Sequence, residues 1–174
     1  MKRYLKAEGI VLTKKNLLNK DKFVTILTLE YGKLRLFAKG VKKITSRRLP
    51  HLETGNYIKI DVYRKQDRLY LQESTLISGF YKIKNDPKKQ NFLYVFFFVL
   101  NKLLPEEQKE EAVFGLTKHF LSTLSEKQFK QQDLNLFLNK LLYKLGYLQQ
   151  EEPQDKLYQL VQEIINEKLP EVML

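Results

Sequence analysis

The densest group of residues that could bind a ligand lies between Glu30 and Glu53, where seven basic side chains occur without one acidic residue among them. Ammonium and guanidinium groups at this density bind phosphates, so a polyanion is the ligand that the group predicts. An aromatic ring, Phe37, stands within the group and offers a face on which a nucleic-acid base can stack. The basic residues are Lys33, Arg35, Lys39, Lys42, Lys43, Arg47 and Arg48.

Only the first part of this basic group alternates regularly between apolar and other residues, so the group divides into two parts. Residues 33–39 follow the period of two that is typical of a strand with one buried face, so Leu34, Leu36 and Ala38 would face inward. Residues 42–48 are predicted to form a loop, and taken alone they could equally be a solvated basic surface without a ligand. Beside a basic strand face, nucleic acid is the favoured ligand. The outer face of the strand would carry Lys33, Arg35, Phe37 and Lys39.

The charge of the whole chain, +11, is distributed unevenly between its two halves. Residues 1–90 contain 22 Lys and Arg against 8 Asp and Glu, whereas residues 91–174 contain 9 against 12. Net charges of +14 and −3 predict a domain that binds a polyanion, attached to a domain with a different task. A basic surface kept only for solubility is the alternative, but it would not need to be confined to one half of the chain.

Residues that catalyse reactions or hold metals do not converge in a recognisable pattern. The chain has no cysteine, which excludes thiolate ligands, cysteine nucleophiles and disulfides. Its two histidines, His51 and His119, fall in different predicted domains and lack the spacing of a metal pair. The glutamates at 106, 107, 110 and 111 are typical of the solvated first turn of a helix, where carboxylates complement the helix dipole. The sequence therefore predicts a binding protein rather than an enzyme, with no cofactor and no metal.

No segment of the sequence predicts export or a membrane span. The basic start of the chain is not followed by an apolar run of signal-peptide length, because Glu8, Lys14 and Lys15 interrupt it. The most apolar stretch, residues 92–100, falls well short of the roughly 20 residues that a spanning helix needs. We expect a cytoplasmic protein with no membrane partner.

The period of the apolar residues changes near Asp86, and this change predicts two kinds of structure. Before it, period-two stretches at residues 5–13, 23–29, 33–39, 57–64 and 68–72 predict five short strands, enough for a small closed barrel. After it, the period is 3.6, and Asp86 followed by Pro87 supplies the N-cap and first residue of a helix. That first helix, apolar nearly all round, is expected to be central. Further helix boundaries are predicted at Pro105, at a capping box in 125–128 that would open the third helix, at Gly146 and at Pro153.

Several short segments of the first half occur in a recognisable order and spacing. They are Glu8-Gly9-Ile10-Val11-Leu12, Asp21-Lys22 leading into Val24-Thr25-Ile26-Leu27-Thr28, Glu30-Tyr31-Gly32-Lys33, Ala38-Lys39-Gly40-Val41-Lys42-Lys43 and Ser46-Arg47. Over residues 1 to about 80 this succession resembles the N-terminal domain of the RecO family of recombination mediators. The helical half resembles the family more weakly, through Leu103-Leu104-Pro105-Glu106, Leu145-Gly146-Tyr147 and a final amphipathic helix.

The change of period near Asp86 divides the chain into two expected domains, at residues 1–84 and 85–174. The resemblance implies that the fold is α+β, with a five-stranded OB-fold β-barrel in the first domain and α-helices in the second. It also implies a DNA-binding protein of recombination and repair that binds single- and double-stranded DNA and anneals complementary strands. With RecR, such a protein helps RecA replace the single-strand-binding protein, whose C-terminal tail would bind the helical domain. A bacterial, nucleoid-associated location follows from the same resemblance.

The chain departs from the family pattern at one place. Many members carry a zinc-binding segment with four cysteines after the Gly-Tyr position, whereas here residues 149–152 lead almost directly to the last helix. DNA would be held through its phosphates, with Phe37 and either Tyr63 or Tyr70 as stacking platforms. An RNA-binding OB-fold adaptor protein is the alternative function.

Overall fold

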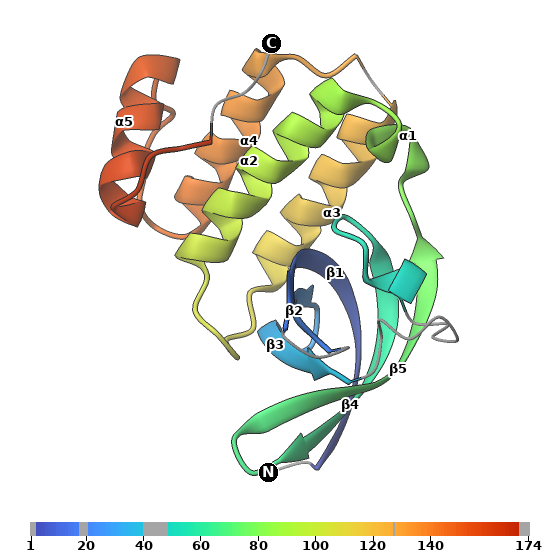
Figure 1. Cartoon of the computed structure of the whole chain (residues 1–174). Helices are drawn as coiled ribbons and strands as arrows, with labels where there is room; N and C mark the ends of the chain where they lie inside the picture. The colour runs from blue at the N-terminus through green and yellow to red at the C-terminus, as the bar shows by residue number, and fades with distance from the viewer. Residues whose placement is uncertain (1–2, 18–20, 40–48, 127, 171–174) are drawn as a thin grey trace. The chain divides into compact units, whose positions relative to one another are not determined.

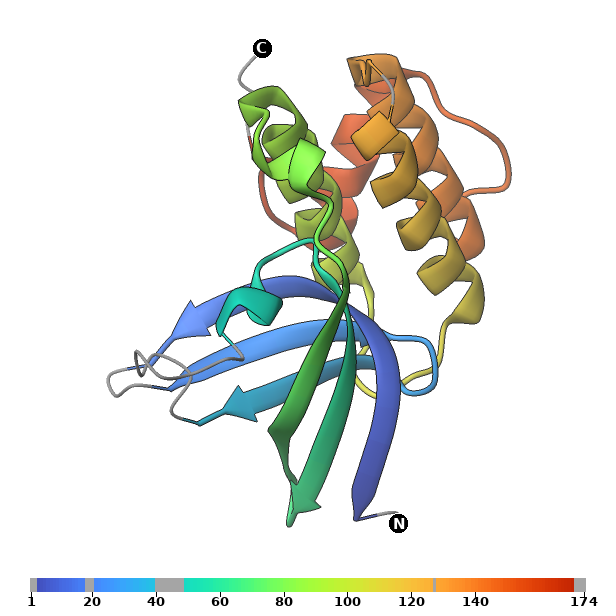
Figure 2. The same cartoon turned by 90° about the vertical axis from the view of Figure 1, so that its right-hand side faces the viewer.

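The computed structural model describes residues 3–17, 21–39, 49–126 and 128–170. Its first part is a closed barrel of five strands in the order β1-β2-β3-β5-β4 (Figure 1, Figure 2). Neighbouring strands are antiparallel except β3 and β5, which run parallel. A five-stranded barrel of this kind followed by helices confirms the predicted fold class. The elements are β1 (Tyr4–Asn16), β2 (Lys22–Thr28), β3 (Gly32–Ala38), the short 3-10 helix η1 (Leu49–Leu52), β4 (Tyr57–Lys65) and β5 (Arg68–Ser78).

Alternating side chains of the strands fill the barrel core. In β3, Leu34, Leu36 and Ala38 are fully buried, as the sequence predicts. Each large apolar side chain removed from water in this way contributes roughly 1.5–3 kcal/mol to folding. The inward register therefore fixes which side chains of each strand point outward. The same core contains Ile58, Ile60 and Val62 from β4, and Leu69 and Leu71 from β5.

The described part of the chain divides into two compact units. The barrel unit comprises the residues up to Gly79 together with Pro105–Phe114, and the helical unit comprises Phe80–Leu104 and the residues from Gly115 onward. The barrel unit thus includes a segment that lies between two helices in the sequence. The helices are α1 (Tyr81–Lys84), α2 (Pro87–Leu103), α3 (Glu111–Glu126), α4 (Gln131–Lys144) and α5 (Gln154–Ile165).

Phenylalanine rings form the centre of the helical unit. The ring of Phe96 in α2 stacks on that of Phe120 in α3 at 4.1 Å between centroids and meets that of Phe137 in α4 at 6.3 Å. The start of α2 is capped as predicted, because the Asp86 carboxylate accepts hydrogen bonds from the backbone N–H groups of residues 88 and 89. Helix α2, in the middle of this core, has the central position that its apolar sequence predicts.

The predicted start of the third helix is wrong. Residues 125 and 126 end α3 instead of capping a new helix, and α4 begins at Gln131, where Asp133 accepts a hydrogen bond from the backbone N–H of Lys130. The physical reason is Phe129, whose ring contacts those of Phe92 and Phe120 at 5.2 and 5.6 Å between centroids. Packing of this half-buried ring against α2 and α3 holds the connection between α3 and α4 in a non-helical conformation.

Tyr57, the first residue of β4, connects three parts of the barrel unit. Its side chain is 7% exposed, and its hydroxyl donates a hydrogen bond to the Glu8 carboxylate of β1. Burial and this hydrogen bond raise the pKa of Tyr57 to about 12. The ring also meets that of Phe114, at 6.2 Å between centroids. Tyr57 therefore fastens β4 both to β1 and to the returning segment Pro105–Phe114.

Candidate nucleic-acid interface

Three aromatic side chains lie in register across the outer faces of β2, β3 and β5. Phe23 is paired with Phe37 between β2 and β3, and Phe37 is paired with Tyr70 between β3 and β5. Their ring centroids are 5.3 and 5.7 Å apart, and both pairs meet edge to face. The neighbours Leu36 and Leu69 point into the core, so the three rings face outward and offer a row of surfaces for stacking.

Two cations stand over this row of rings. The guanidinium of Arg35 lies 4.6 Å from the centroid of Phe23. The ammonium of Lys39 lies 5.9 Å from the centroid of Phe37 and 5.0 Å from that of Tyr70. Cation–π contacts of this length hold the charges beside the ring faces. The arrangement can therefore pair phosphates and stack bases at the same place.

A pocket of about 460 Å³ opens beside these rings. Arg35 and Arg68 contribute positive charge to its walls, but acidic side chains from two other segments contribute negative charge. The basic group is free of acidic residues only along the sequence, since folding brings carboxylates from elsewhere next to it. The lining residues are Phe23, Arg35, Phe37, Asp67, Arg68, Leu69, Glu106 and Glu107.

Lys33 occupies the outer side of β3, but its side chain is covered. It is only 9% exposed, because the segment 105–108 runs beside it: Glu106 forms a parallel bridge with Lys33, and the N–H of Glu107 donates to the Lys33 carbonyl at 2.9 Å. Burial lowers the pKa of Lys33, and the negative charge of Glu106 partly opposes this shift. Since β5 pairs only with Leu36 and Phe37 of β3, the earlier half of β3 remains open to this segment.

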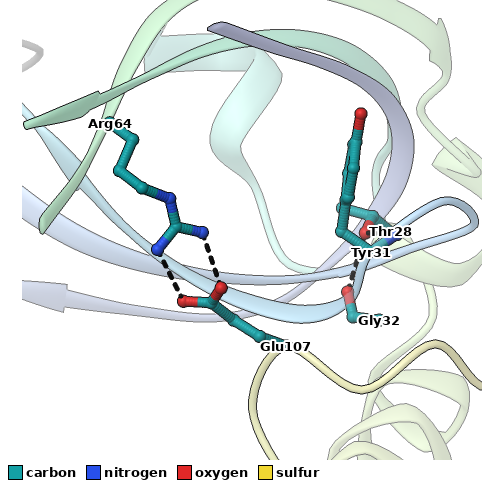
Figure 3. A network of polar contacts seen from close by, with 5 residues as sticks. All are labelled: Thr28, Tyr31, Gly32, Arg64 and Glu107. Atoms are coloured by element: carbon teal, nitrogen blue, oxygen red, sulfur yellow. Dashed lines mark hydrogen bonds and ion pairs between the residues drawn. The ribbon is translucent and has the colours of Figure 1, made fainter. Parts of the chain in front are cut away.

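An ion pair fastens the same segment to the end of β4. Both terminal nitrogens of Arg64 donate to the Glu107 carboxylate, at 3.2 and 2.6 Å, and the Arg64 side chain is only 12% exposed (Figure 3). The prediction that residues 106 and 107 form the solvated first turn of a helix is therefore wrong. Helix α3 begins later, at Glu111, because the preceding residues are held against the barrel.

A tight turn between β2 and β3 accommodates this contact. The Thr28 hydroxyl accepts from the N–H of Tyr31 at 3.1 Å and donates to the carbonyl of Gly32 at 2.7 Å (Figure 3). Gly32 has a φ of +70°, and a Cβ placed there would lie 1.8 Å from the carbonyl oxygen of Gln108. Only glycine permits both the positive φ and the close approach of the segment 105–108.

The structure brings together part of the set of residues predicted from the sequence. Arg35, Phe37 and Lys39 lie on one outer face, and Lys33 is beside them but covered. Phe23 and Arg68 also line this site but were not among the residues predicted from the sequence, although the alternation of β2 places Phe23 on the outward face. Lys42, Lys43, Arg47 and Arg48 lie outside the described residues.

The described residues contain neither a candidate metal site nor a candidate membrane-spanning helix. Within residues 3–17, 21–39, 49–126 and 128–170, no three His, Asp or Glu side chains are grouped so that they could hold a metal ion. In the same ranges, no helix combines the length and apolar character that crossing a membrane requires. His51 has a structural contact, since its Nδ1 lies 2.9 Å from the carbonyl oxygen of Ser74.

Comparison with known proteins matches both halves of the chain to one group of relatives. The family described as "Recombination protein O N terminal" matches residues 1–80. A protein of Thermoanaerobacter sp. named "DNA repair protein RecO" is 33% identical over 156 residues, which are 85% of this chain and 60% of that protein. A protein of the same name from Caldanaerobacter subterraneus is 30% identical over 150 residues, 84% of this chain and 60% of its own length. The chain thus spans about 60% of the length of these relatives.

Proposed function

The chain belongs to the RecO family, and on that premise we propose that it acts in DNA repair and recombination by binding single- and double-stranded DNA and annealing complementary strands. Its relatives carry the name of a DNA repair protein. The proposed role is binding, with no chemical step of its own, and it is proposed for a chain shorter than those relatives.

The observation that carries this proposal is the row of Phe23, Phe37 and Tyr70 with Arg35 and Lys39 above it. Stacking on aromatic rings is tolerant of sequence, because every base has a flat face, and cations beside the rings attract phosphates. Arg35 and Lys39 are the two cations of this set that could hydrogen-bond to a base edge, and both lie over ring faces, at 4.6 Å from the centroid of Phe23 and 5.0 Å from that of Tyr70. We therefore expect binding of single strands with little sequence preference.

Annealing follows from the same chemistry. Two single strands repel each other as polyanions, and a surface that neutralises phosphates on both lowers this repulsion. If the bases lie on open ring faces rather than in enclosed pockets, their pairing edges stay accessible to a second strand. The basic segment at 42–48 would add further phosphate contacts to this surface.

For the helical unit we propose contact with the C-terminal tail of the single-strand-binding protein, in keeping with the family. A groove of about 460 Å³ lies along α4 and the turn after it. Tyr143, which is 63% exposed, gives it an apolar wall, and Lys140 and Lys144 give it positive charge. These groups suit a peptide that combines apolar and acidic residues. RecR and RecA are proposed as functional partners without an assigned surface.

The central test is the binding of a fluorescent oligothymidylate by the full chain and by Phe37→Ala. Phe98→Ala is the matched control, because Phe98 is also half-buried and also has a lysine ammonium, that of Lys102, 5.6 Å from its ring centroid, but in the helical unit. We expect Phe37→Ala to lower affinity about tenfold and Phe98→Ala to leave it unchanged. Four to six phosphate contacts predict a log-log salt slope of about −3 to −4.

Binding of matched RNA oligomers and an annealing assay distinguish the proposed DNA-binding function from the alternative, an RNA-binding adaptor. Preference for RNA, without acceleration of DNA annealing, would favour an RNA-binding adaptor instead. Annealing of complementary strands already coated with single-strand-binding protein measures the mediator role most directly, because it requires both the DNA surface and the partner contact. A salt slope near zero would contradict the phosphate model.

A further inference from the structure

The row of aromatic residues on β2, β3 and β5 continues around the barrel. Tyr70 of β5 is paired in register with Tyr63 of β4, and Tyr63 is paired with Tyr4 of β1. Because the strand order is β1-β2-β3-β5-β4, the five residues form one row that contributes a single aromatic side chain from every strand. We call this row the aromatic belt: Phe23, Phe37, Tyr70, Tyr63 and Tyr4.

Tyr4 and Tyr63, on β1 and β4, have the same kinds of contact as the rings on β2 and β3. The rings of Tyr4 and Tyr63 are 5.1 Å apart between centroids. The guanidinium of Arg3 lies 5.3 Å from the centroid of Tyr63, and its Nε donates to the Tyr63 hydroxyl at 2.9 Å. An outward ring pair with a cation over it thus stands on β1 and β4, as it does on β2 and β3.

The exposure of Tyr4 and the basic side chains close to it favour binding of a nucleic acid at this end of the barrel. Tyr4 is 69% exposed, so its ring contributes little to the folded core and remains open to stacking. In both views the start of β1 lies beside the hairpin of β4 and β5 (Figure 1, Figure 2). Two exposed cations of that hairpin, Lys65 and Arg68, are paired in register next to the belt. Below the belt, Lys6 and Asp61 form an ion pair of 3.1 Å, and Glu73 of β5, in register with Asp61, adds one exposed carboxylate to that row.

We propose that Tyr4, Tyr63 and Arg3 form a second subsite for single-stranded nucleic acid, continuous with the one on β2, β3 and β5. This inference rests on the proposed function and extends it, because it assigns a path across the strands and a length. Neighbouring strands are about 4.8 Å apart, so the four steps of the belt span about 19 Å. With about 3.4 Å per stacked nucleotide, the belt holds about six nucleotides, of which the first three rings hold about three.

The test uses the full chain with oligothymidylates of four and twelve nucleotides. The variant Tyr4→Ala with Tyr63→Ala should bind the twelve-nucleotide oligomer about tenfold more weakly, because stacking at one end of the path is lost. Three nucleotides of the four-nucleotide oligomer still fit on Phe23, Phe37 and Tyr70, so its affinity should fall by no more than about twofold, because one of its two possible binding positions is lost. Saturation with poly(dT) should show the site size falling from about six to about three nucleotides.

Tyr81→Ala is the matched control, because Tyr81 is 65% exposed with the Lys84 ammonium 5.8 Å from its ring centroid, but lies in the helical unit outside the belt. It should bind both oligomers as the unchanged protein does. Tyr4→Ala alone serves if the double variant fails to fold, since its exposed ring can be removed without opening the core.

Three results distinguish failure of the second subsite from failure of the proposed DNA-binding function. Unchanged binding of both oligomers by the Tyr4 and Tyr63 variants, with loss in Phe37→Ala, would overturn the second subsite and leave the proposed function standing. An equal loss for both oligomers would also overturn the subsite, because the effect would not depend on the length of the path. Failure of the unchanged protein to bind either oligomer would overturn both proposals.

Discussion

Replacing Glu107 by glutamine should lower the stability of the protein while raising its affinity for single-stranded DNA. The Arg64 side chain is 12% exposed, and its Nε is buried without a hydrogen-bond partner, so the charge of Glu107 is its main compensation. Breaking a buried pair costs about 3–5 kcal/mol and breaking an exposed one about 0–1 kcal/mol. Glu107 is 45% exposed, and we therefore expect a loss of about 1–2 kcal/mol. For a chain of this size, that is a fall in Tm of about 2–8 °C.

The opposite effect on affinity follows from the place of Glu107 in the pocket. Its carboxylate shares the walls with Arg35 and Arg68, where it repels phosphates and occupies Arg64. The substitution removes one negative charge and releases one positive charge. A partly exposed charge contact contributes about 0.5–1 kcal/mol, which corresponds to an affinity about two- to fivefold higher. The salt slope should become steeper by about 0.7 for one added phosphate contact.

Thermal melting and fluorescence anisotropy on the same preparations measure the two effects. The control is Glu111→Gln in the same segment, because Glu111 pairs with Lys109 at 3.1 Å in an exposed position, with side chains 72% and 53% exposed. Its stability should change by less than about 0.5 kcal/mol. A Glu107→Gln variant with the parental Tm would refute the role assigned to Arg64. One with weaker DNA binding would refute the view that the acidic segment opposes phosphates.

Three further predictions concern individual side chains of the barrel unit. Arg35→Ala should make the salt slope less negative by about 0.7, whereas Lys33→Met should leave it unchanged because that amine is covered; salt titration of DNA binding measures both. Arg47→Glu with Arg48→Glu should weaken binding about 10- to 100-fold, with no more than about 0.5 kcal/mol of stability lost per site, as checked by anisotropy and thermal melting. The raised pKa of Tyr57 contributes stability that is present below pH 10 and is lost as pH rises to about 12. Tyr57→Phe should therefore show a smaller loss of stability than the parent between pH 10 and 12 in urea unfolding.

Features that depend on the alternation of apolar and polar residues, or on helix capping, could mostly be predicted from the sequence. The buried set of β3, the outward positions of Arg35 and Phe37, and the cap formed by Asp86 follow from periods and local hydrogen bonding. These features depend on residues close together in the chain. Local pattern is therefore enough to find a strand, its inner face and the start of a helix.

Features that depend on distant residues could not be predicted in this way. The aromatic belt needs the register of five strands, and that register includes irregularities between Val11 and Thr13 in β1 and between Asp61 and Val62 in β4. A shift of one residue at either place would move a strand's outward side chains to the other face. Alternation within a strand carries no information on its partner's register, so Tyr4 could not be placed beside Tyr63 from the sequence.

The contacts of the returning segment Pro105–Phe114 also depend on residues that are distant in the sequence. They affect where the boundary between the two domains lies. A cut near residue 84, proposed from the change of period, separates Arg64 from Glu107 and Tyr57 from Phe114, although both contacts belong to the barrel unit. A fragment ending there would keep the closed barrel but expose the early half of β3 and leave a largely buried guanidinium unpaired. The break in helical pattern at Pro105 is visible in the sequence, but a break indicates only that a helix stops. The backbone after this break contacts the early half of β3. That half is open because β5 pairs with only two residues of the strand.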